Sequence, residues 1–353
     1  MKVVTVVGAR PQFIKAAMVS RSLEAAAITE VMIHTGQHYD HGMSAVFFTE
    51  LGMAEPACNL GIGSGPHGAQ TGRMLEALED VLAGEQPDRV VVYGDTNSTL
   101  AGALAAAKLH LPLAHVEAGL RSFNRSMPEE INRIATDAIS DLLLAPTRSA
   151  AVQLQKEGIP DARIRITGDV MYDATLHFRD QAIRQSAILT ELGLGSQPFV
   201  LATIHRAENT DVPDRLAAIL AGLNVVAAEL PVIWPIHPRS REALGERDPG
   251  AVRLVEPVGY FDMLRLEAAA AVIATDSGGV QKEAFFHRVP CVTVRTETEW
   301  TELVDLGWNR IVPPESGPAI ARAILAAIGS HGREGAPFGD GDAAGSIVRA
   351  LLE

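Results

Sequence analysis

Short apolar runs, each followed by a longer segment of helical character, recur along this chain. Residues 3–7 form a continuous run ended by a glycine, and Pro11 then suits the first turn of a helix. Similar runs predict further strands at residues 31–35, 89–93, 113–116 and 142–145. Helices are predicted up to residue 27, near 43–51, at 71–82, at 98–109 and from 128. Strands without polar alternation are typical of a parallel sheet covered on both faces.

The same alternation begins again in the second half of the chain. Five more strands are predicted at residues 199–203, 232–236, 252–255, 271–275 and 291–294. Two such series predict an α/β protein with two Rossmann-like domains. The stretch 168–195 is mostly polar and helical, so we place the first domain at residues 1–170 and the second at 171–343. A glycine-rich loop then precedes a last helix, which we assign to residues 344–353.

Composition narrows the class of protein. The length of 353 residues fits two domains, and a net charge of −13 disfavours non-specific binding to nucleic acid. The two cysteines lack the spacing of a metal site, and no apolar run reaches the ~18 residues that span a membrane. The first apolar run is too short for a signal peptide. We therefore expect a cytoplasmic enzyme with no nucleic-acid or membrane partner.

Charged residues directly follow several predicted strands. Parallel sheets bind ligands beyond the carboxyl ends of their strands, so these residues are candidates for a site. In the first half they are Arg10, Lys15, Asp95, Glu117 and the pair Glu129-Glu130; in the second half they are His205, His237 and Asp276. An acid at a helix start can simply complement the helix dipole, and we interpret Glu130 in that way. The recurrence in both halves predicts convergence on one cleft.

The turn at residues 276–279 predicts a phosphate site. Gly278 and Gly279 let the backbone approach an anion closely, and the helix that follows offers free N–H groups. The first turn of the chain, in contrast, lacks the three spaced glycines of a dinucleotide fingerprint, which disfavours NAD.

Six segments, together spanning nearly the whole chain, resemble the non-hydrolysing UDP-N-acetylglucosamine 2-epimerases. They are GARPQFIKA (8–16), YGDTNSTLAGALAA (93–106), HVEAGLRS (115–122), MPEEINR (127–133), TIHRAEN (203–209) and TDSGGVQKEA (275–284). The resemblance implies a fold like that of the GT-B glycosyltransferases, with the active site in the cleft between the domains and the last helix returning to the first domain. It also implies a homodimer and a reaction without redox cofactor or metal.

The resemblance further implies a reaction and roles for single residues. The reaction is the reversible C2 epimerisation of UDP-N-acetylglucosamine to UDP-N-acetylmannosamine, by elimination and re-addition of UDP through a 2-acetamidoglucal. The implied catalytic residues are Asp95, Glu117, Glu129 and His205, the first three as acid/base groups and His205 also as a diphosphate contact. The implied UDP contacts are Arg10, Lys15, Ser277, Gly278, Gly279 and Glu283, of which Glu283 binds the ribose. Closure of the domains by a hinge near residues 168–195 is expected.

Two departures from the usual family pattern leave the substrate open. Trp300 replaces an arginine in the segment 295–302, and the first turn reads GARPQFIKA rather than GTRPEAIKM. Both features resemble the branch that acts on UDP-2,3-diacetamido-2,3-dideoxy-glucuronate. A GT-B glycosyltransferase and a non-catalytic UDP-sugar sensor are further alternatives, but neither needs three carboxylates around C2.

The segment 35–40 bears on regulation. Some family members bind a second UDP-N-acetylglucosamine there as an activator; Gln37 and His38 match that pattern, whereas Tyr39 and Asp40 do not. Asp40 would place a negative charge beside a diphosphate. No obligatory activation is therefore expected.

Overall fold

The computed structural model describes residues 1–37 and 50–353. These residues form two compact units, one of Met1–Leu176 with Ala336–Glu353 and one of His177–Gly335. The division falls inside helix α7 (Val170–Gln185), within the stretch where a hinge is predicted. The hinge itself stays a prediction. The predicted activator residues His38, Tyr39 and Asp40, and most of the helix predicted near 43–51, lie outside the described residues.

The first unit is built on a sheet of seven parallel strands. Its order is β3-β2-β1-β4-β5-β6-β7. The strands are β1 (Lys2–Val7), β2 (Thr29–His34), β3 (Cys58–Asn59), β4 (Arg89–Tyr93), β5 (Leu113–Val116), β6 (Leu142–Ala145) and β7 (Ile164–Ile166). The strand order reverses between β1 and β4, and at such a switch point the carboxyl ends of the strands leave space for a ligand.

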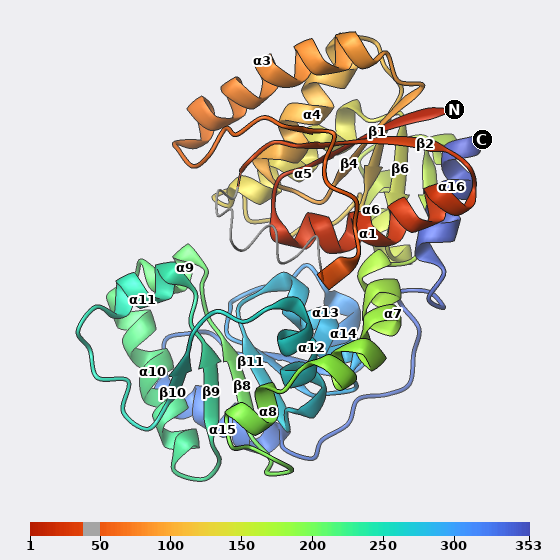
Figure 1. The fold of residues 1–353 in the computed structure, drawn as a ribbon. Helices are drawn as coiled ribbons and strands as arrows, with labels where there is room; N and C mark the ends of the chain where they lie inside the picture. Colours follow the sequence, from red (N-terminus) through yellow and green to blue (C-terminus); the bar gives the residue numbers. More distant parts are fainter. Residues whose placement is uncertain (38–49) are drawn as a thin grey trace. The chain divides into compact units, whose positions relative to one another are not determined.

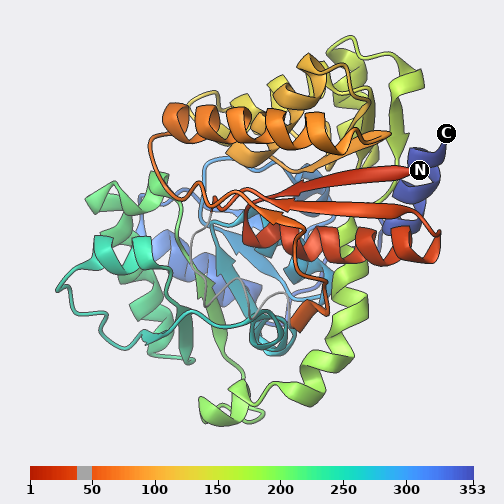
Figure 2. The same ribbon diagram turned by 45° about the horizontal axis from the view of Figure 1, so that its top comes forward.

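Helices cover both faces of this sheet. They are α1 (Arg10–Ala25), α3 (His67–Glu85), α4 (Asn97–Lys108), α5 (Pro128–Ile139), α6 (Arg148–Lys156) and α16 (Ala343–Leu352). Figures 1 and 2 show α3 and α4 on one side of β1 and β4, with α1 and α16 on the other. Gly102 favours the close approach of α4, because a Cβ there would lie only 3.1 Å from Val92 and 3.2 Å from Val6. Buried valines of β1 and β4 pack against Met74 and Leu78 of α3.

The C-terminal helix α16 belongs to this first unit. Asp173 of α7 accepts hydrogen bonds from the backbone N–H groups of Ala343 (3.1 Å) and Ala344 (2.7 Å). A carboxylate at a helix N-terminus satisfies free donors and complements the dipole. Ile347 and Leu351 are buried, and the helix packs against α1. The last segment of the chain is thereby fixed to the sheet formed by the first.

The second unit is built on a sheet of six parallel strands in the order β10-β9-β8-β11-β12-β13. The strands are β8 (Val200–Thr203), β9 (Val232–Pro235), β10 (Arg253–Val255), β11 (Val272–Thr275), β12 (Cys291–Thr293) and β13 (Asn309–Ile311). Its remaining helices are α8 (Ile188–Glu191), α9 (Ala207–Thr210), α10 (Pro213–Ala227), α11 (Pro238–Leu244), α12 (Tyr260–Ala269), α13 (Gly278–Phe286), α14 (Thr301–Asp305) and α15 (Gly317–Ala327).

Two apolar layers enclose the second sheet. One contains the buried residues of α10 and α15, and the other those of α8, α12 and α13. Helices α10 and α15 touch through glycine: a Cβ on Gly222 would lie 2.8 Å from the carbonyl oxygen of Gly317. The prediction of two parallel sheets is confirmed. Strands β3, β7 and β13 were not predicted.

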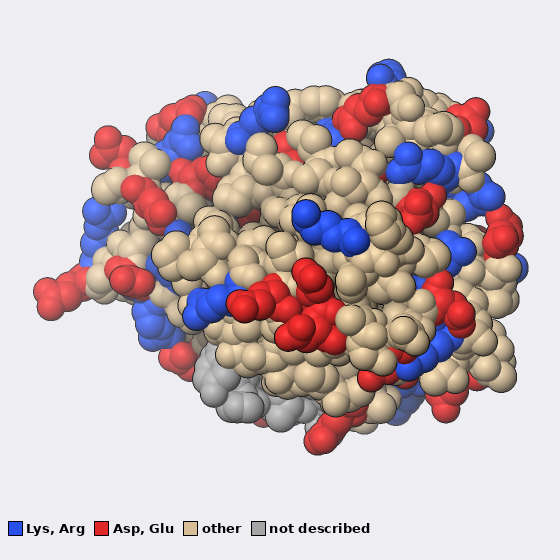
Figure 3. Space-filling model, turned by 90° about the horizontal axis from the view of Figure 1, so that it is seen from above, with Lys and Arg blue, Asp and Glu red and all other residues tan. Residues whose placement is uncertain are grey.

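The described helices include none that is both long enough and apolar enough to span a bilayer. On the face shown in Figure 3, lysines and arginines are interspersed with aspartates and glutamates. The residues that the structure describes on this face therefore form no continuous basic patch of the kind that binds a nucleic-acid backbone.

Candidate active site

Lys15 and Glu117 form a buried ion pair at the carboxyl edge of the first sheet. Lys15 lies on α1, Glu117 follows β5, and the Lys15 Nζ contacts Oε2 of Glu117 with only 9% and 11% of the two side chains exposed. Glu117 has a φ of 71°, in the left-handed region that non-glycine residues avoid. The Cα of Gly94 packs against the pair, because a Cβ there would lie 3.3 Å from the Glu117 carboxylate.

Asp95 lies in the next turn, directly after Gly94. Its carboxylate accepts a hydrogen bond of 2.6 Å from Nη1 of Arg133, and one third of its side chain is exposed. Asn132 of the same helix donates to the Asp95 carbonyl oxygen at 2.9 Å. Helix α5 therefore holds both the backbone and the side chain of Asp95, and leaves part of the carboxylate accessible.

Glu129 and Glu130 are neighbours at the start of α5 with opposite environments. Glu130 is buried and accepts from the backbone N–H groups of Ser122 (3.0 Å) and Phe123 (2.9 Å), and it pairs with Arg133. Glu130 therefore has a structural role, but its hydrogen bonds go to residues 122 and 123 rather than to the free N–H groups of its own helix. The Glu129 side chain is half-buried and makes no hydrogen bond or ion pair with any part of the chain that the structure describes. Of the two, Glu129 is the one available to a ligand.

Arg133 joins these elements. Its guanidinium contacts both Asp95 and Glu130, so the turn after β4 and the start of α5 are linked by one buried cation. The structure thus brings Lys15 and Glu117 into direct contact, places Asp95 in the adjoining turn, and connects Asp95 through Arg133 to the helix that carries Glu129.

The turn after β1 is organised by Gln12. Its Oε1 accepts from the backbone N–H groups of Gly8 (2.8 Å) and Ala9 (3.0 Å), while its Nε2 donates to the carbonyl oxygen of Tyr93 at 2.7 Å. A carboxylate could not make the last of these bonds because it has no donor. Gln12 therefore suits this turn where the usual family pattern has glutamate.

Arg10 begins helix α1 beside the same turn. Burial lowers the pKa of its guanidinium, and the nearby charge of Glu50 acts in the opposite direction. A partly buried arginine at a helix start is a suitable contact for an anion, because a guanidinium is less strongly hydrated than an ammonium.

His115 and Asp137 form a buried pair beside the turns that carry Asp95 and Glu117. His115 of β5 is fully buried, with Nδ1 2.7 Å from Oδ1 of Asp137 and Nε2 2.7 Å from the carbonyl oxygen of Gly94. Asp137 also accepts from the Gly119 backbone and pairs with Arg121. Burial alone would raise the pKa of Asp137, but the hydrogen bonds and charges of His115 and Arg121 lower it below its usual value. Sequence reasoning did not single out either residue.

Asp276 organises the site of the second unit. It follows β11, is fully buried, and accepts from the backbone N–H groups of His205 (3.0 Å) and Arg206 (3.0 Å). Asn209 donates to it at 3.0 Å. The His205 ring is about one third exposed and lies 5.4 Å from the His237 ring, between centroids. Both predicted histidines are therefore together at the carboxyl edge of this sheet.

Ser277, Gly278 and Gly279 form the start of α13, as the phosphate prediction requires. Ser277 is the N-cap residue, and its side chain makes no capping bond. Gly278 is packed closely: a Cβ there would lie 2.4 Å from Oε1 of Glu299. That carboxylate pairs with Arg295 at 2.9 Å. A diphosphate bound at this helix start would therefore meet backbone N–H groups beside an acid that is already neutralised.

Glu283 lies on the same helix beside a second buried acid, Glu267 of α12. Glu267 is completely buried, and among residues 1–37 and 50–353 no hydrogen-bond donor reaches its oxygens unless one of the two carboxyl groups holds a proton. Burial, together with the charge and hydrogen bond of Glu283, raises the pKa of Glu267 well above its usual range. The Nε2 of His287 lies 3.9 Å from Oε2 of Glu267. Burial, and to a lesser extent the charge of Arg179, lowers the pKa of His287 to about 4.

Trp300 is buried at the position where the usual family pattern has arginine. The Lys282 Nζ lies over its ring, 4.3 Å from the centroid. Such an arrangement stabilises a lysine away from water. Lys282 therefore brings a positive charge to this part of the second unit.

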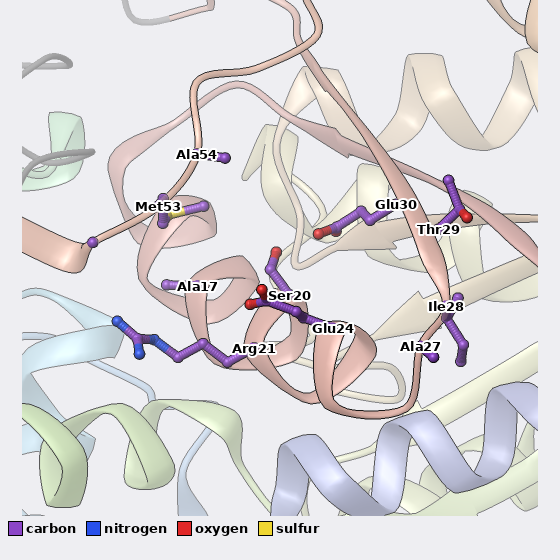
Figure 4. Close-up of a pocket in the computed structure, with 11 residues that line it drawn as sticks. Ala17, Ser20, Arg21, Glu24, Ala27, Ile28, Thr29, Glu30, Met53 and Ala54 are labelled. Carbon is purple, nitrogen blue, oxygen red and sulfur yellow. The ribbon is translucent and has the colours of Figure 1, made fainter.

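A separate cavity of about 460 Å³ lies between α1, the start of β2 and residues 52–54. Figure 4 shows Ser20 projecting from α1 and Glu30 from β2 into it. Burial raises the pKa of Glu30, against the hydrogen bonds of Ser20 and Thr5. Its lining includes none of the predicted catalytic residues. In residues 1–37 and 50–353 no cluster of three or more His, Cys, Asp or Glu side chains could hold a metal ion.

Comparison with known proteins identifies the family of this chain. The profile of the family described as UDP-N-acetylglucosamine 2-epimerase matches residues 21–352. The chain is 50% identical, over the full length of both proteins, to a UDP-2,3-diacetamido-2,3-dideoxy-D-glucuronate 2-epimerase of Pseudomonas aeruginosa. It is 43% identical to a UDP-N-acetylglucosamine 2-epimerase of Methanocaldococcus jannaschii, over 99% of each.

A solved structure of the M. jannaschii enzyme in complex with UDP-GlcNAc and UDP has the same fold. It matches with a TM-score of 0.94 at 42% identity, covering 100% of this chain and 99% of the other. Two parallel sheets of seven and six strands are thus the GT-B-like architecture that the resemblance implied. The chain belongs to the UDP-N-acetylglucosamine 2-epimerase family, and it is an isomerase of UDP-linked sugars.

Proposed function

We propose that this chain inverts C2 of a UDP-linked 2-acetamido sugar by elimination and re-addition of UDP. A base removes the C2 proton while the C1–O bond to UDP breaks, which leaves a 2-acetamidoglucal. A proton is then delivered to the opposite face of C2, and UDP adds again to C1. The reaction needs acid/base groups on both faces of C2 and a cationic, donor-rich pocket for departing UDP.

Asp95, Glu117 and Glu129 are the proposed acid/base groups. The observation that carries this proposal is the concentration of carboxylates at one edge of the first sheet, with Glu117 held by Lys15 and Asp95 by Arg133. A glycosyltransferase or a UDP-sugar sensor has no need for these three groups around C2. The proposed roles of Arg10, Lys15 and His205 are contacts to the departing diphosphate.

The proposed nucleotide site lies on α13. Ser277, Gly278 and Gly279 would bind the diphosphate through backbone N–H groups, and Glu283 would accept hydrogen bonds from the ribose hydroxyls. Glu283 lies one to two helical turns after that helix start, which fits the separation of a ribose from its diphosphate. The burial of Glu283 beside Glu267 supports a fixed geometry for its carboxylate.

The substrate proposed first is UDP-2,3-diacetamido-2,3-dideoxy-glucuronate. UDP-N-acetylglucosamine, the substrate that the family resemblance implies, becomes the second candidate. What favours the change is the 50% identity over the full length of both chains to the P. aeruginosa enzyme, together with the departures at Trp300 and in the first turn. UDP-N-acetylglucosamine is kept as a candidate because the M. jannaschii enzyme, which is 43% identical over 99% of each chain, is named a UDP-N-acetylglucosamine 2-epimerase.

Exchange of the C2 proton in deuterated water tests both the proposed reaction and the choice of substrate. Each UDP-sugar is incubated separately with the protein, and NMR follows deuterium at C2 and the ratio of the two epimers. We expect deuterium in both epimers of the diacetamido-glucuronate and slower or no exchange with UDP-N-acetylglucosamine. Exchange only with UDP-N-acetylglucosamine would reverse the choice of substrate.

A matched variant separates acid/base chemistry from nucleotide binding. Asp95→Asn keeps the shape of the turn but removes the proton acceptor, so turnover should fall by ~10²–10⁴-fold while the affinity for UDP stays nearly unchanged. UDP binding is measured by calorimetry. Normal turnover in this variant would contradict the role of Asp95.

A further inference from the structure

His115 has two hydrogen-bond partners, and both are acceptors. Its Nδ1 lies 2.7 Å from Oδ1 of Asp137, and its Nε2 lies 2.7 Å from the carbonyl oxygen of Gly94. A neutral imidazole has one N–H donor only, so it could satisfy one of these partners and would turn a lone pair toward the other. The ring is completely buried, so water cannot relieve such a contact.

Asp137 cannot supply the missing proton. Besides His115, it accepts from the Gly119 backbone N–H at 3.1 Å and pairs with Arg121 at 2.7 Å. Arg121 in turn pairs with Glu157 at 2.6 Å. The Gly119 N–H and the Arg121 guanidinium both bind Oδ2 of Asp137, and a cation at this distance favours the ionised form of the acid. Asp137 is therefore a carboxylate, and both hydrogen bonds of His115 must be donated by the ring.

His115 and Asp137 also fix the backbone on both sides of Glu117. His115 comes two residues before Glu117, Gly119 comes two residues after it, and Asp137 binds both. Glu117 itself has a left-handed backbone, which costs free energy unless its surroundings fix it. On the other side, His115 holds the carbonyl oxygen of Gly94, the residue directly before Asp95. One buried ring thus fixes the turns that carry two of the proposed acid/base groups.

We propose that His115 is a buried imidazolium that, with Asp137, acts as a positioning pair for Glu117 and Asp95. This inference rests on the proposed function only for its effect on turnover. The charge of the ring follows from its hydrogen bonds alone. The charged groups that face the ring or its partner are Asp137 of α5, Arg121 after β5 and Glu157 at the end of α6. The two acids carry one more charge than the single arginine, so a positive charge on His115 makes this set of four residues neutral.

NMR of the ¹⁵N-labelled full chain tests the charge directly. At pH 7.5 both ring nitrogens of His115 should resonate as protonated nitrogens, whereas a free histidine at this pH is mostly neutral. His287 provides a reference within the same spectrum, because its pKa of about 4 makes it neutral. The His115 signal is assigned by its loss in His115→Gln. A neutral pattern for His115 at pH 7.5 would overturn the proposal, whatever the activity.

Kinetics of two variants test the positioning role. Asp137→Asn keeps the volume of the side chain but removes its charge, and His115→Gln keeps a donor for only one of the two partners. Displacements of about 1 Å at reacting groups cost ~10²-fold, so kcat should fall by that order in both variants. KM and the affinity for UDP should change less than threefold, because the proposed UDP contacts are made by other residues.

Different results separate this inference from the proposed function. Unchanged kcat in both folded variants, checked by circular dichroism, would overturn the positioning role. If His115→Gln does not fold, the His115 signal is assigned instead by its shift in Asp137→Asn, whose mutated side chain contacts the ring, and the wild-type spectrum then decides the charge. If the wild type epimerises neither UDP-sugar, the proposed function fails, and the NMR result alone confirms or overturns the imidazolium.

Discussion

The buried pair of Lys15 and Glu117 gives a prediction about stability that is independent of substrate. Glu117→Gln removes one charge and leaves Lys15 without its partner in a place where 9% of that side chain is exposed. Breaking a buried ion pair in this way costs ~3–5 kcal/mol, because the remaining charge is poorly solvated. We expect a loss near ~3 kcal/mol, the lower end, since neither side chain is completely dry.

The measurement is hydrogen exchange of the β4 and β5 amides in increasing urea, which reports opening of the first sheet separately from the second. The double variant Lys15→Met/Glu117→Gln should recover part of the loss, because no unpaired charge remains. Its turnover should nevertheless stay at the low level of Glu117→Gln. Comparison of the wild type, the single variant and the double variant would thereby distinguish the effect of Glu117 on stability from its effect on turnover.

An exposed pair on the same unit is the control. Lys2 and Glu85 are paired at 2.5 Å, but 35% of each side chain is exposed. Exposed pairs contribute ~0–1 kcal/mol, so Glu85→Gln should cost less than ~1 kcal/mol. If Glu117→Gln and Glu85→Gln have the same small effect, the reasoning from burial is refuted.

Three further predictions concern the second unit. Glu283→Ala should weaken UDP binding by ~1–3 kcal/mol in calorimetry, through loss of charge-assisted hydrogen bonds, and unchanged affinity would contradict the ribose assignment. Gly278→Ala should weaken UDP binding because its Cβ would lie 2.4 Å from Glu299, whereas Gly84→Ala on α3, with nothing within 4 Å, should bind UDP as the wild type does. Burial beside Glu283 raises the pKa of Glu267 in the folded state, so the stability from this group is present below about pH 4.5 and is lost as pH rises through the folded pKa. Glu267→Gln should therefore gain stability relative to the wild type as pH rises above about 5. A constant difference between the two proteins in urea unfolding would refute the raised pKa.

The inner strands and the edge strand β10 were predictable, whereas the edge strands β3, β7 and β13 were not, for a physical reason. Strands β1, β4, β8 and β11 are buried on both faces, so they appear in the sequence as uninterrupted apolar runs. Strands β3 and β7 have two and three residues and are partly exposed, so they carry no such signal. Their pairing is decided by the neighbouring strand, which local sequence does not encode.

The candidate site was predictable in the same selective way. Residues that directly follow a strand, such as Asp95, Glu117 and His205, are placed by the architecture alone. His115 lies within a strand and meets Asp137 22 residues later, and Glu267 meets Glu283 across two helices. Such partners are found only once the packing of the helices on the sheet is known. Position after a strand therefore identifies the groups that we propose to face a ligand, but it does not identify the groups that hold them in place.

Glu117 shows why local rules fail where the proposed chemistry is concentrated. A turn with a φ of 71° would be least strained with glycine, and Gly94 and Gly119 occupy such positions nearby. A carboxylate there costs ~1–3 kcal/mol of backbone strain. The surrounding structure offsets that cost through the Glu117 and Ala118 backbone bonds to Leu144, the ion pair with Lys15 and the bond from Gly119 to Asp137. A glycine at residue 117 would relax the turn and remove the carboxylate, so the acid at this strained position is itself an argument that the group acts on a ligand.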